Sequence, residues 1–287
     1  MTLKEALQQA SQALAIRHIG DAPQEAQILL KHTLQITQAQ LYLQLEQDLT
    51  SQQWESFWYL VEQRLQHQPA AYLVGHQEFY GMDFYVDRRV LIPRPESELL
   101  VEMALEFARN PLANHPPILA DIGTGSGAIA LSLAKNLPHA RVYATDLSPA
   151  ALEVAAINRT HHSLTDHVIL LQGNLLEPLP EIVDLIVANL PYIKETELEE
   201  TAPELRFEPL AALHGGPDGL EQIRLLLQQA QSKGQPRGCL LIEIGQGQAA
   251  RVKSLARGYF PQADFEMRQD PCGIERVVNI SLRQTRP

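Results

Sequence analysis

Residues 121–127 (DIGTGSG) have the composition of a loop that approaches a nucleotide-like ligand closely. The segment follows a short apolar run and precedes a helical pattern. Glycine lets the backbone come near a ligand, and the free N–H groups at the start of a helix favour an electron-rich partner. The predicted cofactor contacts are Gly123, Thr124, Gly125, Ser126 and Gly127.

An acidic residue, Asp146, ends the next apolar run and lies about 20 residues after the glycine-rich segment. This spacing is typical of a carboxylate that accepts hydrogen bonds from both hydroxyls of a ribose. Ser148, rather than Asp146, is the expected N-cap of the helix that follows. Because Gly123, Gly125 and Ala128 also satisfy the pattern G-x-G-x-x-G/A, these residues fit NAD as well as S-adenosylmethionine.

Residues 189–192 (NLPY) directly follow the fourth apolar run of this part of the chain, VDLIVA, so we expect them at the carboxyl end of a strand beside the ligand crevice. The Asn189 side-chain oxygen and the Leu190 carbonyl oxygen can each accept one N–H of a planar NH₂ group. Pro191 restricts Leu190 to an extended conformation, and Tyr192 can lie against the plane of the group. Two such acceptors would hold a weakly nucleophilic amide nitrogen against a methyl donor.

The elements that position these residues alternate between short apolar runs and helical patterns from Pro117 onward, which indicates an α/β fold with a doubly wound, mostly parallel sheet. Strands are expected at 118–122, 141–146, 167–172, 183–189 and 239–244, and helices at 127–136, 149–159, 217–233 and 246–257. Two further runs, 263–268 and 275–282, are separated by a short loop. They are expected to form an antiparallel hairpin at the sheet edge, which gives seven strands in all.

The N-terminal part of the chain has helical periodicity, with apolar residues such as Leu3, Leu7 and Leu14 on one stripe. It predicts a helix bundle in which both tryptophans are core residues, Thr50 and Gln53 form a capping box, and Pro69 ends the helical part. The expected domains are a helical domain over 1–75, a β-hairpin linker over 76–92 that turns at Gly81, and the α/β domain over 93–287.

The composition limits the classes of partner. The formal net charge is −11, from 34 acidic and 23 basic side chains, and no Lys/Arg cluster occurs that could follow a phosphate backbone, so no direct nucleic-acid partner is expected. The two cysteines and the histidines form no ligand motif, so no metal is assigned. With no apolar signal region and no long apolar run, we expect no membrane partner and a cytoplasmic location.

A long segment without a clear helix, residues 193–216, follows Tyr192. Loops of this length in compact domains are usually functional, so it is expected to be a substrate loop or lid. Its glutamates between 195 and 204 are expected to be solvated charges rather than catalytic carboxylates.

Several stretches resemble the HemK/PrmC family, the peptide chain release factor glutamine methyltransferases, over nearly the whole chain. The first is 72–100, which ends in IPRPESELL and is similar to the family's linker hairpin and its IPRPETE signature. The others are DIGTGSGAIAL at 121–131, RFEPLAALHGGPDGL at 206–220, EIGQGQ at 243–248 and DPCGIERVV at 270–278. The resemblance implies a class I, Rossmann-like methyltransferase domain and an N-terminal helical domain that docks the substrate. It also implies that S-adenosyl-L-methionine methylates the side-chain amide nitrogen of the glutamine in the GGQ motif of class 1 peptide chain release factors.

The same resemblance assigns roles to individual residues. Gly123 to Gly127, Asp146 and Asn189 would contact the cofactor, and Asn189 to Tyr192 would receive the target glutamine as catalytic residues. Leu175, next to Asn174, is the nearest match to a family residue that packs near adenine. The family motif NPPY is NLPY in this chain, so Leu190 replaces a proline, which bears on the rigidity of the loop.

Three other functions fit part of the pattern. A nucleic-acid amino methyltransferase also acts on a weakly nucleophilic amine, one conjugated to a base ring, and uses similar motifs. The negative net charge of this chain argues against this function. An NAD-dependent oxidoreductase function would account for the glycines and Asp146, yet it would assign no role to residues 189–192. A non-enzymatic protein that uses the helical domain for docking would not need Asn189.

Overall fold

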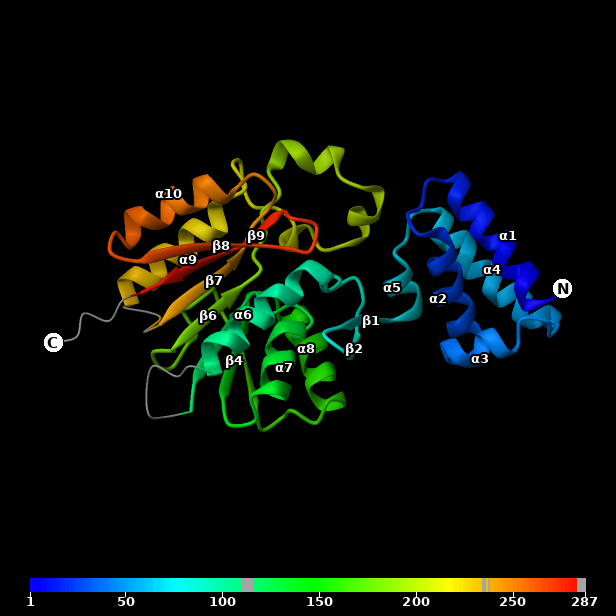
Figure 1. Ribbon diagram of the computed structural model, residues 1–287, viewed down its shortest axis with the longest axis horizontal. Helices are drawn as coiled ribbons and strands as arrows, with labels where there is room; N and C mark the ends of the chain where they lie inside the picture. The colour runs from blue at the N-terminus through cyan, green and yellow to red at the C-terminus, as the bar shows by residue number, and fades with distance from the viewer. Residues whose placement is uncertain (110–115, 234–235, 237, 283–287) are drawn as a thin grey trace. The chain divides into compact units, whose positions relative to one another are not determined.

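The computed structural model describes residues 1–109, 116–233, 236 and 238–282. The chain forms two compact units, and Figure 1 labels most of their helices and strands. The helical unit comprises Met1–His76 with Ala202–Phe207, and the α/β unit comprises Gln77–Thr201 with Glu208–Pro287. The end of the predicted 93–287 domain, residues 283–287, lies outside the described residues.

The helical unit contains short helices that pack around one apolar core. They are α1 (Leu3–Ile16), α2 (Ala22–Leu34), α3 (Gln38–Leu43), α4 (Ser51–Leu65) and α5 (Ala70–Val74), and the short 3-10 helix η3 (Pro203–Phe207) belongs to the same unit. The predicted capping box at the start of α4 is confirmed, since Thr50 Oγ1 accepts the Gln53 N–H at 3.2 Å. Phe57 is fully buried, and Trp54 and Trp58 pack against the core as predicted.

The sequence predicted that the helical part ends at Pro69, but the structure has a further helix, α5, directly after it. Pro69 is the N-cap of α5, and its carbonyl oxygen accepts the Leu73 N–H at 3.2 Å. Proline suits the start of a helix because backbone N–H groups there have no partner within the helix. The prediction was wrong because it treated Pro69 only as a residue that ends helices.

One glutamate of the segment 193–216 is not simply solvated. Within the helical unit, the buried Arg64 side chain donates to Glu25 at 2.7 Å and to Glu204 at 3.1 Å. Nδ1 of His67 lies 3.4 Å from the same oxygen of Glu204. The expectation of a solvated run is therefore wrong at Glu204, because a buried guanidinium needs anionic partners.

Within the described residues, seven strands form the sheet of the α/β unit in the order β5-β4-β3-β6-β7-β9-β8. They are β3 (Ile118–Ile122), β4 (Arg141–Asp146), β5 (Val168–Gln172), β6 (Leu185–Ala188), β7 (Cys239–Glu243), β8 (Asp264–Gln269) and β9 (Glu275–Ser281). β3 to β7 pair in parallel, and β9 pairs antiparallel with β7 and β8. The predicted parallel sheet with an antiparallel hairpin at its edge is confirmed.

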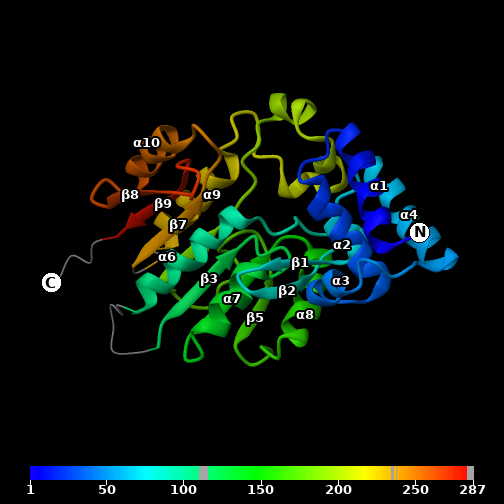
Figure 2. The ribbon, with the colours of Figure 1, turned by 45° about the vertical axis from the view of Figure 1, so that its right-hand side comes forward.

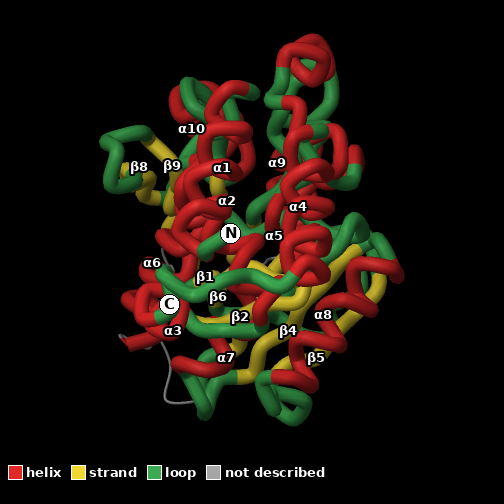
Figure 3. Tube along the Cα trace, turned by 90° about the vertical axis from the view of Figure 1, so that its right-hand side faces the viewer, coloured by secondary structure: helices red, strands yellow, loops and turns green. Residues whose placement is uncertain are grey.

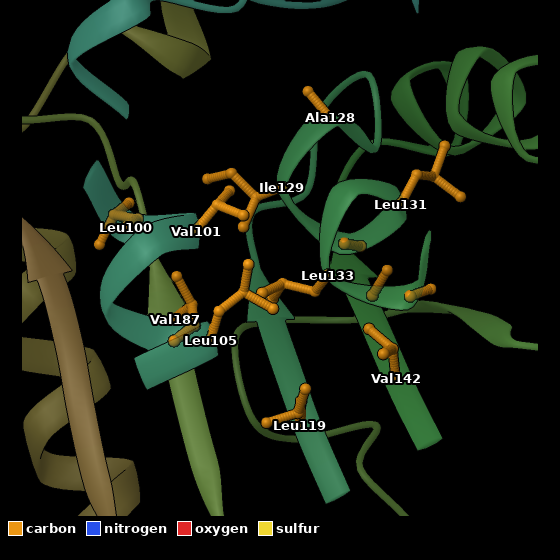
Figure 4. Packing of buried hydrophobic residues seen from close by; sticks show 14 of the residues in the cluster. Leu100, Val101, Leu105, Leu119, Ala128, Ile129, Leu131, Leu133, Val142 and Val187 are labelled. Atoms are coloured by element: carbon orange, nitrogen blue, oxygen red, sulfur yellow. The ribbon is translucent and has the colours of Figure 1, made fainter. Parts of the chain in front are cut away.

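Helices cover both faces of this sheet. They are α6 (Glu98–Arg109), α7 (Ala128–Asn136), α8 (Pro149–His161), α9 (Glu221–Lys233) and α10 (Ala249–Tyr259). Alternate residues of each strand point to opposite faces, so Leu119 packs with α6 and α7 whereas Ala120 packs with α9 and α10. Figure 4 shows part of the first cluster, with Val101 of α6 and Leu133 of α7 gathered beside the strands. α7 and α8 lie beside β4 and β5 (Figure 3).

A two-stranded hairpin, β1 (His76–Phe79) and β2 (Met82–Tyr85), precedes the sheet (Figure 2). Tyr80 and Gly81 both have positive φ, as a tight hairpin turn requires, so the predicted turn at Gly81 is confirmed. Phe79 and Phe84 meet edge to face at 6.2 Å between ring centroids and belong to the same apolar cluster as α6 and α7. The hairpin is therefore packed on the α/β core.

The order of the strands creates a switch point between β3 and β6. From β3 the chain proceeds to β4 and β5 on one side, and then returns to place β6 on the other side. In such a sheet, ligands bind outside the carboxyl ends of the strands at the switch point. The glycine-rich segment follows β3 and Asn189 follows β6, so both lie at this position.

Candidate active site

The glycine-rich loop has the backbone that its sequence predicted. Gly123, Gly125 and Gly127 all have positive φ, a conformation that residues with a Cβ rarely adopt. The N–H groups of Gly123 and Thr124 both donate to the carbonyl oxygen of Thr145 at 2.9 Å. The loop is thereby held against the end of β4, and its last glycine, Gly127, is the N-cap of α7.

A buried carboxylate, Asp121, is hydrogen-bonded to this loop and to the first turn of α7. Its Oδ2 accepts the Thr124 hydroxyl at 2.6 Å and the Ala130 N–H at 3.1 Å. Burial raises the pKa of Asp121 to about 7, although these two hydrogen bonds oppose the shift. Asp121 therefore ties the end of β3 to the first turn of α7.

The structure brings Asp146 to the glycine-rich loop. Its Oδ2 accepts the Gly125 N–H at 2.9 Å, and its Oδ1 accepts the Ser148 N–H at 2.9 Å. Burial raises the pKa of this carboxylate, and hydrogen bonds from the backbone oppose the rise. Each oxygen still has a lone pair for a further donor such as a ribose hydroxyl. Ser148 is the N-cap of α8, as predicted, and accepts the Ala151 N–H at 3.2 Å.

Leu175 lies after β5 in the left-handed region, with φ of 54°. Its carbonyl oxygen accepts the Thr145 hydroxyl at 3.0 Å, and its side chain is buried in the apolar cluster of α9 and α10. The neighbouring Asn174 side chain donates to Glu177 at 3.2 Å. The backbone of Leu175 is thus fixed to the same residue, Thr145, that holds the glycine-rich loop.

The segment 189–192 lies directly against this loop. A Cβ on Gly123 would lie 3.1 Å from Cδ2 of Leu190, which is tighter than an ordinary van der Waals contact, so the glycine eases the close approach of the two segments. Leu190 is buried, whereas Asn189 and Tyr192 are half-buried. The structure therefore places the predicted substrate-binding residues beside the predicted cofactor loop.

Several hydrogen bonds hold the backbone of the NLPY segment and its continuation. The Tyr192 carbonyl oxygen accepts Nε2 of Gln248 at 2.9 Å, and Oε1 of Gln248 accepts the Gly245 N–H at 2.9 Å. The Ile193 N–H donates to the Leu213 carbonyl oxygen at 3.0 Å. These contacts fix the backbone at the C-terminal end of the segment, at Tyr192 and Ile193.

The side chain of Asn189 has a defined hydrogen-bond partner. Its Nδ2 donates to Oγ of Ser97 at 2.9 Å, and the Ser97 hydroxyl donates to Oε2 of Glu243 at 2.6 Å. Burial raises the pKa of Glu243 to about 7, and burial also raises the pKa of Tyr192 to about 12. The amide nitrogen of Asn189 is thus turned toward Ser97, which leaves its oxygen as an acceptor.

Comparisons with known proteins agree with this geometry. A family model described as the PrmC N-terminal domain matches residues 5–75, and one described as the methyltransferase small domain matches residues 97–208. A release factor glutamine methyltransferase of Moorella thermoacetica is 43% identical over 285 residues, which cover 99% of this chain and 100% of that protein. The chain belongs to the release factor glutamine methyltransferase family. The relative from Geobacter sulfurreducens is 40% identical over 280 residues and covers 96% of this chain and 95% of that protein.

Solved structures with low sequence identity share the fold of this methyltransferase. The human METTL16 catalytic domain, in complex with a hairpin of the MAT2A 3′UTR, has a TM-score of 0.61 at 15% identity and covers 75% of this chain and 81% of that chain. A methyltransferase from Pyrococcus furiosus has a TM-score of 0.53 at 18% identity and covers 71% and 90%. These similarities show the methyltransferase fold of the α/β unit.

Sequence reasoning missed two polar residues that contact the NLPY segment, Ser97 at Asn189 and Glu243 at Tyr192. Ser97 lies in a 3-10 turn, η1 (Pro95–Ser97), that precedes α6, and Glu243 is the last residue of β7. Glu243 follows an apolar strand in the same way as Asn189 and Asp146, so its position at the end of β7 was an available signal. Ser97 follows no strand, and its one signal in the sequence was its place in the stretch IPRPESELL at 92–100.

The described parts of the chain contain no group of three or more His, Cys, Asp or Glu side chains arranged to hold a metal ion. Among the same residues, no helix is long and apolar enough to cross a membrane. Of the two cysteines, Cys239 is buried, Cys272 is exposed, and both are free.

Proposed function

We propose that this protein transfers a methyl group from S-adenosyl-L-methionine to the side-chain amide nitrogen of the GGQ glutamine in class 1 peptide chain release factors. The names of the similar full-length relatives support this substrate. The observation that carries the proposal is the orientation of Asn189, whose Nδ2 is bonded to Ser97 while its oxygen is left to accept a hydrogen bond beside the glycine-rich loop. The proposed setting is the cytoplasm, with a protein rather than a nucleic acid or membrane as the partner.

The chemistry requires that an amide NH₂ group be held firmly. Its nitrogen is a poor nucleophile, because the lone pair is delocalised into the carbonyl group. The Asn189 oxygen and the Leu190 carbonyl oxygen accept its two N–H groups and so fix the direction of the nitrogen. Tyr192 lies against the planar amide. After transfer the nitrogen loses a proton to water, so these residues need to supply only position.

The residues that would hold the cofactor are those of the glycine-rich loop, Asp146 and, near the adenine, Leu175. They fit such a ligand, because the three left-handed glycines leave those positions of the loop without a side chain and Asp146 retains lone pairs for ribose hydroxyls. Bound S-adenosyl-L-methionine supplies a methyl group on a positively charged sulfur. The N-terminal domain of human METTL16 in complex with SAH, which is 17% identical with a TM-score of 0.51, has the same fold.

The helical unit is proposed to dock the protein substrate. It matches a family model of its own, over residues 5–75, and has its own apolar core. Its surface exposes large apolar side chains, among them Ile16, Leu43 and Tyr59, which are 76%, 84% and 59% exposed.

Methyl transfer can be tested directly with purified components. The protein is incubated with S-adenosyl-L-methionine labelled in the methyl group and with a class 1 release factor, tRNA, rRNA or DNA in separate reactions. We expect label in the release factor, and none when its GGQ glutamine is replaced by alanine. Label in a nucleic acid instead would support an amino methyltransferase of nucleic acids and contradict the proposal.

A further inference from the structure

We propose that Ser97 and Glu243 are positioning residues, which orient the side-chain amide of Asn189 so that its oxygen, and not its nitrogen, faces the substrate. This inference rests on the proposed function, in which the Asn189 oxygen accepts a hydrogen bond from the target amide. It assigns a role to two residues outside the NLPY segment and the cofactor loop.

The three side chains form a continuous hydrogen-bonded chain from the sheet to the site. Glu243 and Ser97 are 2% and 3% exposed, so water does not compete for their polar atoms. Oγ of Ser97 lies 2.6 Å from Oε2 of Glu243 and 2.9 Å from Nδ2 of Asn189. Both distances are within the ordinary range for hydrogen bonds of these types.

The direction of each hydrogen bond follows from the chemistry of the groups. An ionised carboxylate can only accept, so Glu243 takes the single hydroxyl proton of Ser97. The oxygen of Ser97 then has only lone pairs left for Asn189. An amide can meet a lone pair only with its N–H groups, so Nδ2 of Asn189 must face Ser97 and Oδ1 must face away.

The opposite orientation of Asn189 would be unproductive. An asparagine amide has nearly the same shape when its oxygen and nitrogen are exchanged, so packing alone discriminates weakly between the two orientations. With the amide turned over, Nδ2 of Asn189 would meet the N–H groups of the target amide, donor against donor. The substrate nitrogen would then have only the Leu190 carbonyl oxygen as an acceptor.

The positioning pair is itself held on rigid elements. The Ser97 N–H donates to the Arg94 carbonyl oxygen at 3.0 Å, which fixes the 3-10 turn, and Glu243 ends a strand inside the sheet. The second carboxylate oxygen of Glu243 accepts the Tyr192 hydroxyl at 3.5 Å. Glu243 thus contacts both ends of the segment that would bind the substrate, one directly and one through Ser97.

Protonation of Glu243 would allow the Ser97–Glu243 hydrogen bond to reverse, because a carboxylic acid can donate to Ser97. The Ser97 hydroxyl could then donate to Asn189, and the orientation of the Asn189 amide would no longer be fixed. Burial raises the pKa of Glu243 to about 7, and the Ser97 hydrogen bond and the positive charge of Arg276 oppose the rise. The other groups that face it are Glu96, which raises its pKa, and Tyr192, which lowers it. We therefore expect kcat to fall as the pH is lowered through about 7, as the acid form accumulates.

The test compares full-length variants Ser97→Ala and Ser97→Thr with the unsubstituted protein. Ser97→Ala removes the acceptor for Asn189, so we expect kcat/KM for the release factor to fall about 10- to 100-fold, the range for one lost buried hydrogen bond. Ser97→Thr keeps the hydroxyl and is expected to restore most of this activity. Affinity for S-adenosylhomocysteine, measured by calorimetry, should stay within about twofold in both variants.

Two further variants separate positioning from a general effect on folding. Ser132 is a fully buried serine of α7 outside the site, so Ser132→Ala is the matched control and should leave kcat/KM unchanged. Glu243→Gln keeps an acceptor for Ser97 but cannot ionise, so the dependence of kcat on pH around 7 should disappear while measurable activity remains.

The outcomes distinguish this inference from the proposed function. If the unsubstituted protein methylates the release factor and Ser97→Ala does so equally well, the positioning role is wrong and the proposed function stands. The positioning role is also wrong if Ser97→Thr is as slow as Ser97→Ala at an unchanged Tm. If the unsubstituted protein binds S-adenosylhomocysteine but does not methylate the release factor, the proposed function fails and the positioning role fails with it.

Discussion

Replacing Asn189 with alanine is expected to lower kcat/KM for release factor methylation about 1000-fold. The substitution removes one of the two acceptors that hold the target amide, and loss of a single preorganised polar group of this kind costs roughly 10²- to 10³-fold in other enzymes. The expected loss is at the upper end of this range, because the NH₂ group of the target glutamine can rotate when Leu190 is its one remaining acceptor. The measurement is steady-state methyl transfer to the purified release factor.

The same substitution should have little effect on the fold or the cofactor. Asn189 is half-buried, and its side chain donates a hydrogen bond to Ser97. We expect Tm to change by less than about 3 °C, which corresponds to less than about 1 kcal/mol for a domain of this size. Asn136→Ala, which removes an exposed amide at the end of α7 that donates to the Ser132 carbonyl oxygen at 2.9 Å, is the control. Near-normal kinetics of Asn189→Ala would exclude Asn189 as the amide acceptor.

Gly215→Ala is expected to lower kcat about 100-fold, although Gly215 would touch neither the substrate nor the cofactor. A Cβ at this position would lie 2.7 Å from both the Pro191 carbonyl oxygen and Cα of Tyr192. Both contacts are with backbone, which cannot rotate away as a flexible side chain can. The NLPY segment must therefore shift, and a displacement of about 1 Å in a site of this kind can cost about 100-fold in rate.

A second glycine provides the control for this effect. Gly258 lies on the exposed side of α10, and a Cβ there would have no atom within 4 Å. Gly258→Ala should leave kcat unchanged and stabilise the helix by up to about 1 kcal/mol. If Gly215→Ala kept the full rate at an unchanged affinity for S-adenosylhomocysteine, the fixed position of residues 191–192 would not matter for transfer.

The α/β sheet could be predicted because buried parallel strands are nearly all apolar and stand out between helical patterns. The predicted strand 118–122 coincides with β3, and 141–146 coincides with β4. Helix boundaries were less predictable. The helix expected from residue 217 begins at Glu221, because Gly219 is in the left-handed region, with φ of 74°, and cannot continue a helix turn.

The short helices α3 and α5 of the helical unit were not predicted, since six and five residues are too few to show a periodicity. A capping box of Thr37 and Gln40, of the same kind as that of Thr50, was present in the sequence before α3. Local capping signals were therefore more informative for these helices than the apolar pattern.

Some residues of the candidate site could be predicted from the sequence, and others could not. The glycine-rich loop, Asp146 and Asn189 each follow a strand of the sheet, and parallel topology places the carboxyl ends of these strands together. Ser97 is 92 positions before Asn189 in the chain and follows no strand, so only the packed structure reveals their contact. Pairings of this kind depend on how α6 packs on the sheet, which the local sequence does not specify.

The identity of the methylated atom tests the central claim most directly. A class 1 release factor is incubated with the protein and S-adenosyl-L-methionine, digested, and the GGQ peptide is fragmented in a mass spectrometer. The geometry of Asn189 and Leu190 predicts one added methyl group on the side-chain amide nitrogen of the glutamine. A methyl group on any other residue, or an unmodified peptide despite cofactor binding, would contradict the claim that these two oxygens present a glutamine amide.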